Sequence, residues 1–149
     1  MRRVLSNSKL RSTRSGAALV ETALMLPVLL MVTFGVIEFG RALMVSNLIC
    51  NAAREGTRLG IIQGVTTTEV KNTVVTQVNS TVGTDITAGN VTVTITPYGT
   101  NPNPSNECAN ASSRDLVAVN VSVPYSKVGY FFRYLANVNL RGQAAMRHE

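Results

Sequence analysis

The stretch RSGAALVETALMLPVLLMVTFGVIEFGR, residues 14–41, decides the fold. Within it, residues 17–37 form a long apolar run in which Glu21 is the one charged side chain. As a helix this run is about 31 Å long at about 1.5 Å per residue, close to the thickness of a bilayer core. A buried helix of that length needs more protein around it than 149 residues supply. The run therefore predicts one membrane-spanning helix.

Positive charge is concentrated before this run. The chain has 14 basic and 8 acidic residues, a formal net charge of +6. Five of the basic residues precede Gly16 and no acidic residue does, so the remaining chain is nearly neutral. Such a cluster beside an apolar span predicts a cytoplasmic N-terminus. Because no basic stripe with interleaved aromatic residues follows, nucleic-acid binding is not expected. The five residues are Arg2, Arg3, Lys9, Arg11 and Arg14.

Three kinds of N-terminal segment fit this pattern. A secretory signal peptide would be cut after the apolar run, where Gly40-Arg41-Ala42 has small residues at suitable spacing, but the run is long for a signal. An uncleaved signal anchor needs only the basic residues and the apolar span. A prepilin-type leader would be cut on the cytoplasmic side, between Gly16 and Ala17, so that the apolar run remains in the mature chain.

Glu21 helps to distinguish these alternatives. A carboxylate inside a membrane helix costs about 2.5–3.5 kcal/mol at mid-bilayer and less near the interface, so it usually has a partner. After cleavage behind Gly16, Ala17 would carry a cationic α-amino group. Glu21 could then pair with the amino terminus of a neighbouring subunit. Alternatively, the Glu21 side chain reaches the headgroup region.

Several strings in the chain resemble the TadE-like family, the pilin-like accessory subunits of tight-adherence (Tad/Flp) pilus systems. The resemblance is strongest over residues 14 to 60. It rests on RSGAALVE at 14–21, PVLL at 27–30, GVIEFGR at 35–41, AAREGTR at 52–58 and AAMRHE at 144–149.

The resemblance implies a structural role in pilus assembly for adhesion or surface attachment, with Gly16 and Ala17 as the processing junction and Glu21 as the assembly residue. It implies an inner-membrane, single-pass protein whose C-terminal domain is periplasmic or extracellular. The implied partners are a prepilin peptidase, the Tad assembly platform with its ATPase, other pilin-like subunits and the Flp-type major pilin. The alternative is an uncleaved, membrane-anchored protein whose outer domain binds a ligand or partner.

The rest of the chain predicts a small α+β domain. An apolar stripe continues the first helix through Ala42, Val45, Ile49, Ala52, Gly56 and Leu59, and it would pack on the chain's own sheet or on a neighbouring pilin helix. Thr66 and Glu69 predict a capping box for a second helix. Alternation predicts strands over Val91–Thr96 and Asp115–Tyr125, with a third over Val138–Met146 and a helical turn over residues 129–135.

We therefore expect a type IV pilin-like fold: a basic leader over residues 1–16, a membrane helix over 17–40, and an extracytoplasmic domain over 41–149. In it, one long helix packs on a small antiparallel sheet of about three strands, with a short second helix.

No pattern predicts enzyme chemistry. The acidic residues are scattered, no phosphate loop or paired-cysteine metal motif is present, and His148 lies beside the C-terminus, where we expect it to be mobile. We therefore expect neither catalysis nor a cofactor. Cys50 and Cys108 could form a disulfide outside the cytoplasm, or remain two separate thiols.

Overall fold

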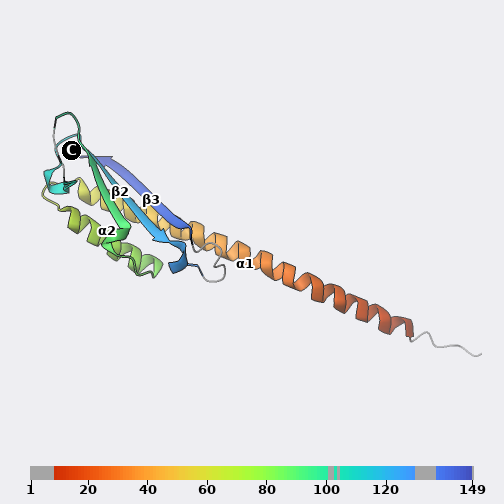
Figure 1. Cartoon of the computed structure of the whole chain (residues 1–149). Coiled ribbons are helices and arrows are strands. Elements are labelled where there is room, and N and C mark those ends of the chain that lie inside the picture. The colour runs from red at the N-terminus through yellow and green to blue at the C-terminus, as the bar shows by residue number, and fades with distance from the viewer. Residues whose placement is uncertain (1–8, 101–102, 104, 130–136, 149) are drawn as a thin grey trace, which may run out of the picture. The chain divides into compact units, whose positions relative to one another are not determined.

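A computed structural model describes residues 9–100, 103, 105–129 and 137–148, with side chains from Gly16 onward. The chain divides into two compact units, Met1–Ile37 and Glu38–Glu149. The first helix, α1 (Lys9–Gly60), contributes to both of them. Figure 1 shows the chain with its helices and strands.

The first unit consists of the N-terminal part of α1. The helix contains Pro27 and has no acidic residue in its first turn. Within the described part of the chain, this is the one helix long and apolar enough to cross a membrane, judged by length and composition. This agrees with the helix predicted from the apolar run.

The second unit is organised around the C-terminal half of α1. Val45, Ile49, Ala52 and Ala53 lie in the core, and the predicted stripe is the buried face of the helix. A side chain at Gly56 would meet Val74 and Val119, which belong to the second helix and to the sheet. The stripe therefore packs on the chain's own domain, as the first of the two alternatives predicts.

The second helix, α2 (Thr67–Val82), has the predicted capping box. The main-chain N–H of Thr66 donates to the Glu69 carboxylate over 2.8 Å, and the N–H of Glu69 donates to the Thr66 hydroxyl over 3.2 Å. The hydrogen bonds from the backbone and then the side chain of Thr66 hold the pKa of Glu69 below its usual value. Gly83 ends the helix in the left-handed conformation, at φ 71°.

Three strands form one antiparallel sheet in the order β1-β2-β3. They are β1 (Val91–Thr96), β2 (Leu116–Pro124) and β3 (Asn139–Arg147), each within about two residues of its prediction. Val93 of β1 pairs with Val119 of β2, and Val119 pairs with Ala144 of β3. Both pairings continue along the strands without a break. Alternate residues of β1 are buried, as the Val/Thr pattern predicts.

One face of the sheet builds the core with the two helices. Val117, Val119, Val121 and Val123 of β2 are buried together with Val70, Val74 and Val78 of α2. Figure 1 shows α2 and the C-terminal half of α1 beside this sheet. The α+β class, with a long N-terminal helix, a second helix and three antiparallel strands, is therefore confirmed.

Single 3₁₀ turns complete the described connections: η1 (Ala88–Asn90), η2 (Cys108–Asn110) and η3 (Tyr125–Lys127). The connection between β1 and β2 contains η2. The helical turn predicted over residues 129–135 falls outside the described residues from 130 onward.

Helix α1 and strand β3 approach each other closely at Gly142. A Cβ atom there would lie 2.7 Å from the Ile49 carbonyl carbon and 2.7 Å from the Cys50 nitrogen. Main-chain atoms cannot rotate away as a flexible side chain can. Only glycine therefore allows this contact.

We predict that Gly142→Ala lowers the free energy of unfolding by about 1–3 kcal/mol, because the added methyl group pushes the helix and the strand apart. Thermal unfolding of the full chain in detergent measures the loss. Gly89→Ala is the matched control, since its nearest neighbour beyond the adjacent residues is the Thr87 hydroxyl at 3.7 Å. Equal melting temperatures for the two variants would contradict the close packing.

Candidate membrane-spanning and assembly site

The predicted processing junction lies in the helical, exposed part of α1. Gly16, Ala17 and Glu21 are all exposed, and a Cβ at Gly16 would meet nothing within 4 Å. Glu21 follows Ala17 by one helical turn. The neighbouring Thr22 hydroxyl donates to the Ala18 carbonyl over 2.8 Å, so its polar group is satisfied within the helix.

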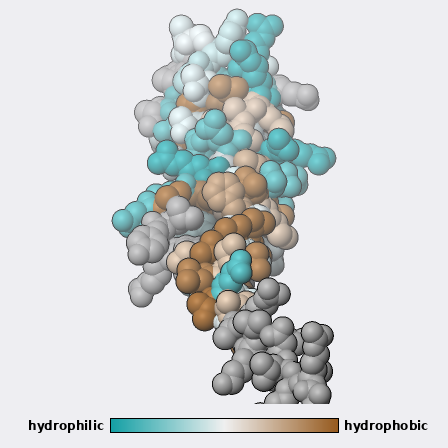
Figure 2. All heavy atoms as spheres, turned by 90° about the vertical axis from the view of Figure 1, so that its right-hand side faces the viewer, coloured by the Kyte–Doolittle hydropathy of each residue, from teal (hydrophilic) through white to brown (hydrophobic). Residues whose placement is uncertain are grey.

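Apolar side chains around this part of α1 are exposed to a degree that is unusual for a water-soluble surface. Leu19, Leu24 and Met31 are more than 70% exposed, and none of the most apolar window is buried. Figure 2 shows most of the brown, hydrophobic residues in the lower part of the coloured surface, with teal residues among them. A continuous apolar surface of this size marks contact with a membrane or with another apolar surface.

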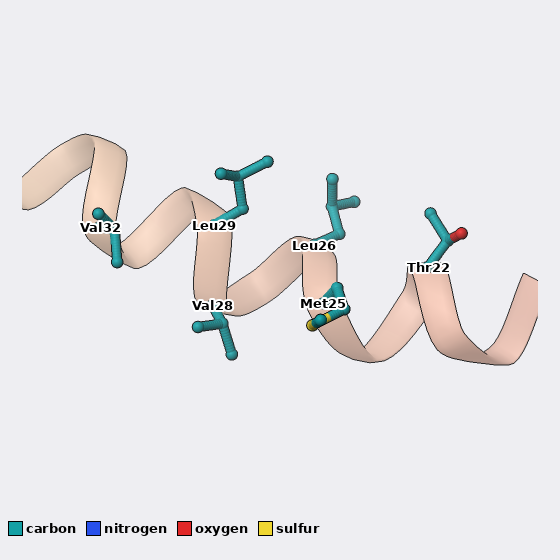
Figure 3. Close-up of a pocket in the computed structure, with 6 residues that line it drawn as sticks. All are labelled: Thr22, Met25, Leu26, Val28, Leu29 and Val32. Atoms are coloured by element: carbon teal, nitrogen blue, oxygen red, sulfur yellow. The ribbon is translucent and has the colours of Figure 1, made fainter.

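A shallow apolar groove runs along this segment. It is lined by Thr22, Met25, Leu26, Val28, Leu29 and Val32. In Figure 3, Thr22, Leu26 and Leu29 project from one side of the helix, and Met25 and Val28 from the other. Because the lining is almost wholly hydrocarbon, the groove can accept lipid chains or another apolar helix, but it has no groups for catalysis.

Glu38 begins the second unit and is buried, with 2% of its surface exposed. It lies against Tyr125 and Gly129, since a Cβ at Gly129 would be 2.8 Å from Glu38 Oε1 and 2.6 Å from Tyr125 Cε1. One helical turn later, the Arg41 Nε donates to the Val128 carbonyl over 2.6 Å. These residues fix the start of the domain helix to η3. Sequence reasoning placed Glu38 among scattered acids and did not find this cluster.

Burial raises the pKa of Tyr125 to about 12. Desolvation is the main cause, followed by the neighbouring Glu38 carboxyl group, while Arg41 acts in the opposite direction. Tyr125 therefore remains neutral throughout the physiological range. The cluster holds a carboxyl group at the end of the apolar run without exposing it.

The AAREGTR segment presents its charges to solvent. Arg54, Glu55 and Arg58 are exposed on α1. The Arg54 guanidinium donates to the Asn51 side chain over 3.4 Å. Within the same segment, Thr57 is buried and its hydroxyl donates to the Ala53 carbonyl over 2.8 Å.

Cys50 and Cys108 are both free thiols, so the disulfide considered above is not present. Cys108 Sγ lies 3.5 Å from the Cβ position of Gly60. Cys50 is ten residues earlier on the same helix, about 15 Å away along its axis. That separation is far beyond the roughly 2 Å of a disulfide bond. Burial raises the pKa of the Cys108 thiol, which lowers its reactivity.

His148 is not mobile, contrary to our expectation. It is buried, and its main-chain N–H donates to the Asp115 carbonyl over 2.8 Å. The buried Asp115 carboxylate accepts from the N–H groups of Tyr98 and Ser112 over 2.7 and 2.8 Å. These contacts close the end of the sheet. Among the described residues no group of His, Cys, Asp and Glu could hold a metal ion.

Residues 16–58 match the model of the family described as TadE-like protein, the same family that the sequence resembles. The matched segment contains the Gly16–Ala17 junction, Glu21, Glu38 and the AAREGTR segment. It ends within α1, before α2 and the sheet. No curated protein and no solved structure matches the chain.

We predict that the free energy of unfolding falls as the pH rises from about 10 to about 12, because the unfolded Tyr125 ionises first, while the folded side chain resists ionisation. The stability that this group contributes is complete below pH 10. Urea unfolding at about pH 8 and about pH 11 measures the loss. The Tyr125→Phe variant should lose less free energy of unfolding between the two pH values than the wild type. The other three tyrosines are present in both proteins, so their contributions cancel when the two losses are compared. An identical loss in both would contradict the raised pKa.

Proposed function

We propose that this chain, with its TadE-like segment, is a minor pilin or pseudopilin that takes part in assembly of a Tad/Flp-type pilus, after a leader has been removed behind Gly16. The family match connects the chain with the Tad pilus, and the TadE-like family is structural rather than enzymatic. A TadE-like segment and one apolar N-terminal helix also fit a single-pass membrane protein.

One observation carries the proposal: the exposed apolar run begins directly after Gly16, which ends a basic segment, and its one carboxylate, Glu21, lies one helical turn after Ala17. The matched segment begins at that glycine. Cleavage there would leave the complete apolar segment on the mature chain and would create a positive charge at Ala17. A neighbouring subunit in register could use this amino group to neutralise Glu21. That pairing would offset the cost of holding a carboxylate in a membrane or a helical bundle.

The proposed topology follows from the charges. The five basic residues keep the leader in the cytoplasm, and the domain that follows the span lies on the periplasmic or extracellular side of the inner membrane. The partners are then a prepilin peptidase at the junction, the assembly platform and its ATPase, and sister pilin-like subunits with the Flp-type major pilin. The pilus would serve adhesion or surface attachment.

The second candidate is an uncleaved, membrane-anchored protein whose outer domain binds a ligand or partner. The buried Glu38 cluster favours neither candidate, because it lies within the domain, which both candidates share. The two candidates differ in the N-terminus of the mature chain.

We predict that protein from the native host begins at Ala17, which intact-mass and peptide mass spectrometry can determine. Gly16→Val should block processing, because a peptidase must approach the junction closely. Gly35→Val is the matched control, since Gly35 is also helical with open space at its Cβ position. An intact Met1 on the wild-type protein in piliated cells would exclude the proposed processing and favour the anchored alternative.

We predict that Glu21→Ala leaves membrane insertion intact and reduces piliation, because the mutant lacks the charge that guides a subunit to its neighbour. Glu21→Gln should also reduce piliation, since it keeps the shape but not the charge. Thr22→Ala, which alters the adjacent exposed side chain, is the control. Pili are counted by electron microscopy and the protein by membrane fractionation. Normal piliation in both Glu21 variants would refute the pairing role.

A further inference from the structure

The outer edge of β3 is formed by the main chain of its odd-numbered residues. In an antiparallel sheet, the N–H and C=O groups of alternate residues point to opposite neighbours. The N–H of Tyr125 donates to the Val138 carbonyl and the N–H of His148 donates to the Asp115 carbonyl, both over 2.8 Å. These bonds flank the β2–β3 pair and show that the even-numbered residues face β2. Arg141, Gln143, Ala145 and Arg147 therefore direct their N–H and C=O groups outward.

This edge is open within the described residues, whereas the opposite edge is partly closed. No hydrogen bond among the described residues uses an outward main-chain group of β3 from Arg141 to Arg147. On β1, the outward N–H of Ile95 donates to the Asn106 side chain over 3.0 Å. Strand β3 also has no proline and no bulge, and its register with β2 is continuous from Asn139 to Arg147. An open edge of this length is a template for another strand.

The charged side chains along this edge are both arginines. Arg141 and Arg147 lie on the exposed face of β3, with Gln143 and Ala145 between them. No described residue of the three strands is acidic. The guanidinium groups of Arg147 and Arg114 lie 6.0 and 5.5 Å from the centre of the same Tyr98 ring. Neither arginine forms an ion pair with a described residue, and Tyr98 is 55% exposed. The ring holds two positive charges at one end of the open edge.

We propose that the outer edge of β3 binds an extended acidic segment of a partner protein, which adds to the sheet as a fourth, antiparallel strand. The outward groups of Arg141, Gln143, Ala145 and Arg147 supply the main-chain hydrogen bonds. Carboxylates spaced six residues apart on the partner face Arg141 and Arg147. A second copy of this chain offers the same arginines on its own β3, so charge favours a different partner. The proposal is independent of the function proposed above, because a cleaved or an anchored chain presents the same edge.

The test uses the full chain in detergent micelles with amide hydrogen exchange followed by NMR. The probe is a synthetic peptide as long as β3, built from alternating Thr and Val, with two glutamates six residues apart on one face. A peptide with lysines at those two places is the matched control. We expect the glutamate peptide to slow exchange at Arg141, Gln143 and Ala145, and to bind at least about tenfold more tightly than the lysine peptide.

Two variants separate main-chain pairing from charge. Ala145→Pro removes an outward donor without touching a bond to β2, so it should leave the fold intact and abolish peptide binding. The double variant Arg141→Glu, Arg147→Glu keeps the edge and should reverse the preference, so that the lysine peptide binds better. Arg54→Glu, on the exposed face of α1, should change neither.

The inference would be overturned by equal binding of the two peptides, by an absence of protection along β3, or by an unreversed preference in the double variant. Protection that depends on protein concentration without any peptide would show instead that copies of this chain pair with each other. The double variant tests the proposal even where the proline substitution prevents folding.

Discussion

The contact between α1 and the sheet is the constraint on which the rest of the domain depends. At Gly142 the strand lies directly against the main chain of Ile49 and Cys50. At Gly56 and Gly60 the helix in turn admits valine side chains from α2 and β2. Gly142 lies on the strand, whereas Gly56 and Gly60 lie on the helix. Together they let α1 and the sheet approach closely along several helical turns. The buried face of α1 thereby places the sheet, and α2 fills the remaining space.

The same helix serves two environments. Up to Ile37 its apolar side chains are exposed, and from Val45 onward one stripe is buried in the domain. The Glu38 cluster stands where the second environment begins. There Tyr125, Arg41 and Gly129 surround a buried carboxyl group, and burial keeps Tyr125 neutral. The domain thus encloses the first carboxyl group that follows the apolar run.

This chain has few charged residues for its length, and the positions of three groups of them are the basis of the functional proposals. Five basic residues precede Gly16, one carboxylate lies in the apolar run, and two arginines lie on the exposed face of β3. The first two features are the basis of the membrane orientation and the assembly role that we propose. The third concerns a partner that would reach the domain from outside. An assembly subunit can use both kinds of contact, since one involves the helix and the other the sheet edge.

The sequence by itself determined the features that depend on local pattern. The apolar run, the capping box at Thr66 and Glu69, the Val/Thr alternation of β1 and the stripe on α1 each predict an element, because hydrophobic period and turn chemistry act over a few residues. The proposed junction at Gly16 and the proposed role of Glu21 also rest on neighbouring residues, and they stay predictions.

Only the tertiary structure decided which distant residues meet. It placed Glu38 against Tyr125, buried His148 beside Asp115, kept Cys50 about three helical turns from Cys108, and left the edge of β3 open. No repeating sequence pattern predicts these features, because each depends on how α1 crosses the sheet and on which strand forms the edge of the sheet. The physical reason is that packing and pairing are set by the register of whole elements, while pattern and propensity are set by adjacent side chains.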